Sequence, residues 1–139
     1  MNLKNVFHIL GIFVFLIGAA MLPPFLISAV LREETWSAIG LSSLVTMGTG
    51  ILMYVFIPRT GERISLTHRE GFVIVTLAWA LASAFGGLPF LVSGVVPTFC
   101  DAYFETMSGF TTTGASVISN LDTASRGILF WRALTHWLG

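Results

Sequence analysis

Three long apolar stretches separated by short polar segments dominate the pattern of this chain. Asp, Glu, Lys and Arg are absent between residues 4 and 32, between 34 and 59, and between 70 and 101. Each interval exceeds the roughly 20 apolar residues with which a helix crosses a bilayer. The pattern predicts three membrane-spanning helices: one ending near Leu31, one over Trp36–Ile57 and one over Gly71–Leu88.

The first stretch contains a proline pair, Pro23 and Pro24. Its start imitates a secretion signal, because Lys4 precedes an apolar run and the small residues 18–20 imitate a cleavage site. The apolar run nevertheless continues to Leu31, beyond the roughly 7 to 15 residues of a signal core. We therefore expect a retained first span that is kinked at the prolines.

Two capping signatures predict where later helices begin. Thr67 and Glu70 form a capping box ahead of the third span, which Gly86, Gly87 and Pro89 are expected to end. The second signature, at residues 98–101, starts a shorter apolar segment that ends near residue 110. As a helix, this segment is roughly 20 Å long, against a hydrocarbon core of about 30 Å. It can enter a bilayer but cannot cross it.

A polar run, Thr111–Ser116, follows this half-length segment. Irregular backbone is tolerated inside a membrane only where it is buried in protein or lines water, so we expect a re-entrant loop. Its free carbonyls, together with a partial negative charge of about half a unit at the preceding helix end, suit K⁺ or Na⁺. Gly114 permits backbone angles that a side chain disfavours. From composition alone, a polar extracellular loop without a ligand remains an open alternative.

Composition agrees with a membrane protein, since 55% of the residues are hydrophobic and 10% are charged. The formal net charge is zero and no basic block occurs, so we expect no nucleic-acid partner. One cysteine and three widely spaced histidines favour neither a disulfide scaffold nor a zinc site. Cys100 and Ser108 lack a nearby base, so we do not expect an enzyme.

Basic residues predict the orientation. The loop between the second and third spans carries Arg59, Arg63 and Arg69, and such residues favour the cytoplasmic side. This places Lys4 and the N-terminus in the cytoplasm and Arg32 outside.

Four polar residues lie in or after the half-length segment: Asp101, Glu105, Arg132 and His136. Arg132 and His136 share one face of the last helix, and Arg132 is expected to reach the outer interface or to pair with an acidic residue of a missing helix. Asp101 is expected to cap its helix. Glu105, one turn later, is a candidate with Asp101 for an outer carboxylate pair that concentrates potassium, and its role stays open.

Residues 101–110 followed by TTTGA resemble the first pore loop of the bacterial TrkH/TrkG potassium uptake family. Residues 69–72 and 87–90 resemble the first pore-domain helix of that family, and residues 128–132 and 136–139 resemble the start of the second. The resemblance covers nearly the whole chain.

The resemblance implies an all-α membrane protein of the superfamily of K⁺ transporters, with two leading transmembrane helices and then helix, re-entrant pore loop, helix repeats. Residues 1–66 would form the leading helices and cytoplasmic loop, and residues 67–139 the first repeat. The backbone carbonyls of Thr112 and Thr113 would bind K⁺, flanked by Thr111 and Gly114. The family also implies K⁺ uptake across the bacterial inner membrane without an organic cofactor, and a cytoplasmic nucleotide-binding regulatory subunit as partner.

The family has four such repeats, whereas this sequence stops at Gly139, within the second helix of one. We therefore expect the N-terminal part of a transporter subunit that does not function alone and needs the remaining pore repeats or a full-length subunit. An assembly or anchoring subunit, an inactive remnant and a homotetrameric cation channel are the alternatives.

Overall fold

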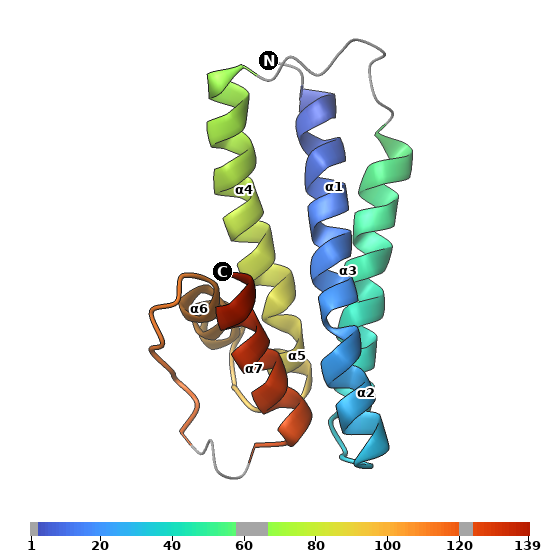
Figure 1. Ribbon diagram of the computed structural model, residues 1–139, viewed down its shortest axis with the longest axis vertical. Helices are drawn as coiled ribbons and strands as arrows, with labels where there is room; N and C mark the ends of the chain where they lie inside the picture. The colour runs from blue at the N-terminus through green and yellow to red at the C-terminus, as the bar shows by residue number, and fades with distance from the viewer. Residues whose placement is uncertain (1–2, 58–66, 120–123) are drawn as a thin grey trace.

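The structure, a computed structural model, describes residues 3–57, 67–119 and 124–139. Within these residues the chain forms helices joined by turns and loops and contains no strand (Figure 1). The helices are α1 (Leu3–Ala20), α2 (Leu22–Val30), α3 (Trp36–Phe56), α4 (His68–Gly86), α5 (Leu88–Val92), α6 (Phe99–Phe110) and α7 (Arg126–Leu138). The predicted all-α class is confirmed. Arg59 and Arg63 lie outside the described residues.

Among the described residues, three stretches are long and apolar enough to cross a membrane, which confirms the expected number of spans: Lys4–Val30, Trp36–Phe56 and His68–Val92. The first consists of α1 and α2, with a break at Met21. Pro23 and Pro24 lie in the first turn of α2, where a missing backbone N–H leaves no helical hydrogen bond unmade. The kink therefore occurs just before the proline pair, as expected.

Small residues bring α1 and α3 close together. A Cβ added to Gly50 would lie 2.5 Å from the backbone nitrogen of Phe15, and one on Gly18 would lie 2.7 Å from the backbone nitrogen of Met47. Ser43 Oγ also donates to the Gly18 carbonyl at 2.8 Å. Close backbone approach through small residues is typical of helix pairs in membranes.

Both ends of α4 are as predicted, and a second short helix follows directly. Thr67 is the N-cap of a complete capping box, and its backbone N–H donates to Glu70 Oε2 at 3.0 Å. Gly87 has the right-handed helical conformation (φ −77°, ψ −19°), so the chain continues directly into α5. Pro89 lies in the first turn of α5, where proline is tolerated. The expected end of the helix at residues 86–89 is confirmed, since α4 ends at Gly86, and the stretch of spanning length continues through α5 to Val92.

Helices α1, α3 and α4 run side by side along the long axis of the molecule (Figure 1). The first turns of α1 and α4 lie at one end, and α2 and α5 lie toward the other. The buried core is concentrated near α2 and α5, and includes Met21, Ile39, Phe90, Ile128 and Trp131. This core supports α6 and α7, which carry the candidate site.

Candidate ion-binding site

Helix α6 begins at the predicted cap. Thr98 Oγ1 accepts from the backbone N–H of Asp101 at 3.1 Å and donates to Asp101 Oδ2 at 2.6 Å. Thr98 is therefore the capping residue, and the Asp101 carboxylate supports it through the Thr98 hydroxyl rather than capping the helix itself. The helix has 12 residues, close to the predicted half length.

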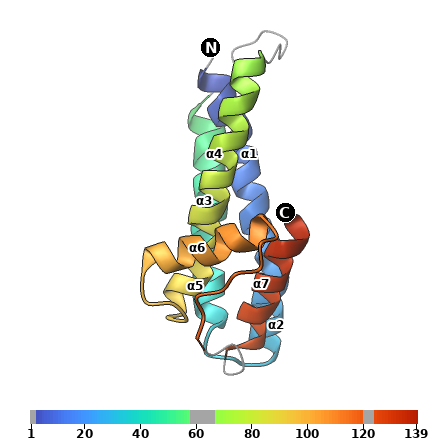
Figure 2. The ribbon, with the colours of Figure 1, turned by 90° about the vertical axis from the view of Figure 1, so that its left-hand side faces the viewer.

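Helix α6 lies across the long axis of the bundle rather than along it (Figure 2). Beyond its C-terminus, the chain reverses and runs back toward the end where α2 and α5 lie (Figure 2). The half-length helix therefore places residues 111–116 part of the way along the bundle, with exposed side chains. The reversal of the chain agrees with the expected path, whereas the crosswise direction of α6 was not predicted.

Backbone donors of the polar run turn back onto the end of α6. The N–H of Thr111 donates to the Met107 carbonyl at 2.9 Å, and the N–H of Thr113 donates to the Ser108 carbonyl at 3.0 Å. Between them, the N–H of Thr112 donates to the Gly109 carbonyl at 2.9 Å. These bonds satisfy the last carbonyls of the helix and fix the start of the run.

Two residues of the run adopt positive φ angles. Gly114 has φ +77°, which confirms that this position uses the freedom of glycine. No heavy atom lies within 4 Å of a Cβ built on Gly114, so there is room for a side chain. The positive φ angle is what disfavours any other residue at this position. Thr112 has φ +55°, which is unusual for a β-branched residue.

Two of the six carbonyls in the run are occupied, and those of Thr112, Thr113, Gly114 and Ser116 accept no hydrogen bond from the described residues. The Thr111 carbonyl accepts from Thr112 Oγ1 at 2.7 Å, and the Ala115 carbonyl accepts from Ser108 Oγ at 2.7 Å. Within the described residues, no donor is bonded to the carbonyl oxygens of Thr112 or Thr113. The run therefore has free backbone oxygens at the two positions where we expect cation ligands.

A partly buried ion pair next to the run was not predicted. Arg132 Nε of α7 lies 2.6 Å from Glu105 Oε1 of α6, and the Glu105 side chain is 1% exposed. Glu105 also accepts from Ser116 Oγ at 3.0 Å and from the Val117 N–H at 2.9 Å. Glu105 is thus not an exposed outer carboxylate, and Arg132 pairs within this chain rather than with a missing helix. The signal in the sequence was an acidic residue in the middle of α6 and a basic residue in the middle of α7, because buried charges pair.

Glu33 caps α7, and this contact was not predicted from the sequence. Its carboxylate accepts from the backbone N–H groups of Arg126 at 2.8 Å and Gly127 at 3.1 Å, and from Ser28 Oγ at 2.7 Å. Burial alone would raise the pKa of Glu33, but the hydrogen bonds from Ser28, Gly127 and Arg126 and the charge of Arg126 outweigh it. The pKa of Glu33 is therefore below its ordinary value of 4.5.

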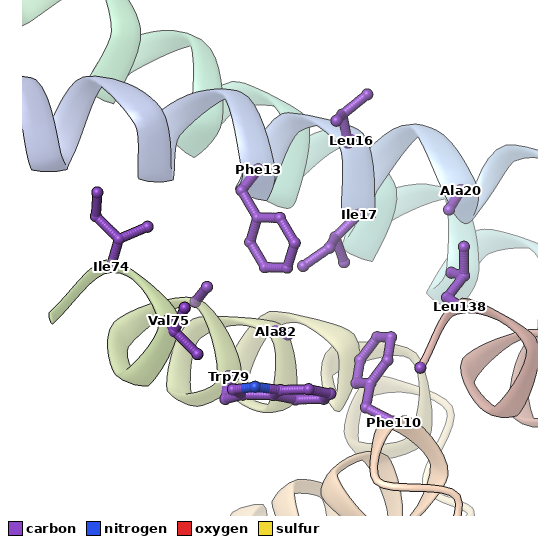
Figure 3. A pocket seen from close by; sticks show the side chains of 12 residues that line it. Phe13, Leu16, Ile17, Ala20, Ile74, Val75, Trp79, Ala82, Phe110 and Leu138 are labelled. Atoms are coloured by element: carbon purple, nitrogen blue, oxygen red, sulfur yellow. The ribbon is translucent and has the colours of Figure 1, made fainter. Parts of the chain in front are cut away.

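A cavity of about 450 Å³ lies beside the end of α6, between α1 and α4 (Figure 3). Phe13 and Ile17 line it from α1, Trp79 from α4, and Phe110 and Leu138 close one end. The lining is apolar and offers no set of oxygen ligands, so this cavity does not suit a cation.

This chain is similar in sequence to known proteins along its whole length. The profile of the family described as TrkH, cation transport protein, matches residues 51–139. The whole chain is similar to the Trk system potassium uptake protein TrkH of Halomonas elongata, with 39% identity over 142 residues, and to that of Escherichia coli K12, with 34% identity over 140 residues. The chain spans 29% of the length of each.

The fold is likewise similar to a solved structure. The crystal structure of the potassium transporter TrkH from Vibrio parahaemolyticus matches 99% of this chain with a TM-score of 0.91 and 32% identity, and the match covers 29% of that protein. Together with the three helices of spanning length, these relatives indicate an integral membrane protein.

Proposed function

Because this chain belongs to the TrkH family of cation transport proteins, we propose that it is the N-terminal part of a pore-forming potassium uptake subunit. It contributes one of the pore segments that together surround the ion, and it requires the remaining pore repeats to transport. The curated relatives that it matches are called potassium uptake proteins, which supports K⁺ as the transported ion.

The free carbonyls of Thr112 and Thr113 are the observation that carries this proposal. Removing water from K⁺ requires several oxygen ligands at once, and backbone carbonyls serve this purpose in potassium-selective filters. On either side of the two oxygens, the Thr111 carbonyl is occupied by Thr112 Oγ1 and Gly114 has a positive φ angle. Both proposed ligands belong to an exposed segment, as an ion path requires.

The same proposal includes the domain organisation of the chain, its membrane location and its partner. Residues 1–66 form the two leading helices and a cytoplasmic loop, and residues 67–139 form the first helix, pore loop, helix repeat. The subunit lies in the bacterial inner membrane with its N-terminus in the cytoplasm, in agreement with Lys4 and Arg69 in the first turns of α1 and α4 at one end. A cytoplasmic nucleotide-binding regulatory subunit is the expected partner, and no catalytic activity is proposed.

Transport by a chimera tests the proposal. Residues 1–139 would replace the matched segment of the Halomonas elongata protein, and K⁺ uptake would be measured in cells that lack their own uptake systems. We expect the chimera to transport K⁺ and Gly114→Asp to abolish uptake, because a side chain at φ +77° strains the run and a carboxylate adds charge beside the ligands.

Gly94→Asp is the matched control. Gly94 also has positive φ (+72°) and open space around a built Cβ, but it lies between α5 and α6, outside the run. We expect this variant to retain uptake. A chimera without K⁺ uptake, or a Gly114→Asp variant as active as Gly94→Asp, would contradict the proposal.

A further inference from the structure

The polar run is attached to α6 at two successive points. Ser108 forms the first, since its carbonyl accepts from the Thr113 N–H at 3.0 Å and its Oγ donates to the Ala115 carbonyl at 2.7 Å. Glu105 forms the second, since its carboxylate accepts from Ser116 Oγ and from the Val117 N–H. Glu105 and Ser108 are three residues apart and share one face of the helix. Residues 113–117 are therefore hydrogen-bonded along this face of α6.

The second attachment is itself held from another helix. Arg132 Nε of α7 binds Glu105 Oε1 at 2.6 Å, while Oε2 of the same carboxylate accepts from the Val117 N–H at 2.9 Å. With Ser116 Oγ at 3.0 Å from both oxygens, the carboxylate joins α6, α7 and the returning chain. All of these donors come from outside α6, so the carboxylate links separate parts of the fold rather than stabilising its own helix.

The proposed ion ligands lie between fixed ends. Before Thr112, the run is bonded to the end of α6, and after Thr113, the chain is held at Ala115 by Ser108 and at Ser116 by Glu105. Carbonyl ligands discriminate K⁺ from the smaller Na⁺ through the number and arrangement of their oxygens. Oxygens on a chain fixed at both ends cannot rearrange freely around the smaller ion.

We infer that Glu105 is a positioning residue for the ion path: its contacts with Arg132, Ser116 and Val117 fix the backbone after Gly114 and so maintain the selectivity of the site for K⁺ over Na⁺. This inference rests on the proposed function, and it adds to it a residue that touches no ion.

Two double variants of the chimera separate positioning from general stability. Glu105→Met with Arg132→Met removes both charges, so neither is left buried without its partner. Glu105→Gln with Arg132→Met is equally uncharged but keeps a side-chain oxygen that accepts from the Val117 N–H. We expect the first to insert in the membrane and to lose roughly tenfold in K⁺ over Na⁺ selectivity, the scale of one hydrogen bond to a charged group, and the second to recover most of it.

Ser116→Ala and Ser119→Ala form a matched pair of single variants. Ser116 Oγ binds Glu105, whereas Ser119 makes no hydrogen bond with the described residues. We expect selectivity to fall in Ser116→Ala alone. In the purified chimera, hydrogen exchange at the Val117 amide should accelerate in the variant with Glu105→Met and Arg132→Met, and not in the one with Glu105→Gln and Arg132→Met.

The outcomes distinguish this inference from the proposed function. Equal selectivity in the two double variants, or an unchanged exchange rate at Val117, would overturn the positioning role. If Gly114→Asp still abolished uptake, the proposed function would stand. A chimera that transports no K⁺ would overturn both.

Discussion

At the scale of single residues, backbone strain coincides with a proposed ion ligand. Among the described residues other than glycine, positive φ occurs at Arg32 and Thr112. Arg32 lies in the turn after α2, whereas Thr112 lies in the polar run. A residue held in this region costs on the order of 1–3 kcal/mol, which the surrounding hydrogen bonds have to offset. The end of α6 therefore imposes a conformation on Thr112 that threonine does not prefer.

Replacement of two neighbouring threonines by glycine tests this strain. Thr112→Gly removes an unfavourable φ, whereas Thr113 has no positive φ and its Oγ1 lies 2.9 Å from that of Thr111. Both substitutions increase the conformational entropy of the unfolded chain by the same amount. The difference in stability between the two variants therefore reflects the folded state. We expect Thr112→Gly to be more stable than Thr113→Gly by at least about 1 kcal/mol, measured by thermal unfolding in mild detergent. Equal stabilities would show that Thr112 is unstrained.

Local features of single residues could be predicted from the sequence, and distant pairings could not. The caps at Thr67 and Thr98 and the positive φ at Gly114 depend on residues within three or four positions, so the sequence contains their signal. Glu105 and Arg132 are 27 positions apart, and their meeting depends on how α6 crosses the bundle. The spacing of hydrophobic residues does not determine the direction in which α6 crosses the bundle. The sequence alone therefore could not predict which charged residues pair.

At the scale of helices, close packing of α1 on α3 depends on where glycine is placed. Gly50 faces the backbone of Phe15, and its built Cβ has no room. Gly48 lies on the same helix, and nothing lies within 4 Å of a Cβ built on it. The two glycines thus differ in their neighbours while sharing a helical environment.

Alanine at these two positions should therefore act in opposite directions. We expect Gly50→Ala to destabilise the protein by about 1–3 kcal/mol, the usual cost of overpacking, because backbone rather than a flexible side chain is in the way. Gly48→Ala should be neutral or stabilising by up to about 1 kcal/mol, since alanine favours the helix. Midpoints of thermal unfolding in detergent measure both. A Gly50→Ala variant as stable as Gly48→Ala would show that the helices are not tightly packed here.

At the scale of the whole molecule, Glu33 connects the leading helices to the last one. Its carboxylate, in the turn between α2 and α3, accepts from the first backbone N–H groups of α7, more than 90 positions away. Carboxylates are favourable at helix N-termini, where free N–H groups and the helix dipole meet. The two parts of the chain are thereby joined at one end of the bundle.

The lowered pKa of Glu33 predicts a dependence of stability on pH. Because the folded pKa lies below the ordinary value of 4.5, the carboxylate contributes fully above about pH 4.5, and its contribution is lost as the pH falls through the folded value. Glu33→Gln should cost about 1 kcal/mol at pH 7, the usual value of a helix cap, and should reduce the loss of stability below pH 4.5. Thermal unfolding from pH 7 to pH 3.5 measures this.

Glu34→Gln is the control, because Glu34 is exposed and its carboxylate forms no hydrogen bond with the described residues. We expect this variant to match the parent at every pH. If Glu33→Gln and Glu34→Gln gave the same pH profile, the cap at α7 would contribute nothing to stability.

Helix α7 is held by three separate elements, and this limits how it can move. Glu33 binds its first turn, Trp131 Nε1 donates to the Gly86 carbonyl of α4 at 2.9 Å, and Arg132 binds Glu105 of α6. Sliding along its axis, or rotation about it, would break all three attachments at once. Helix α7 is therefore fixed relative to its neighbours, and any rearrangement of the described chain that preserves these contacts has to occur in other segments.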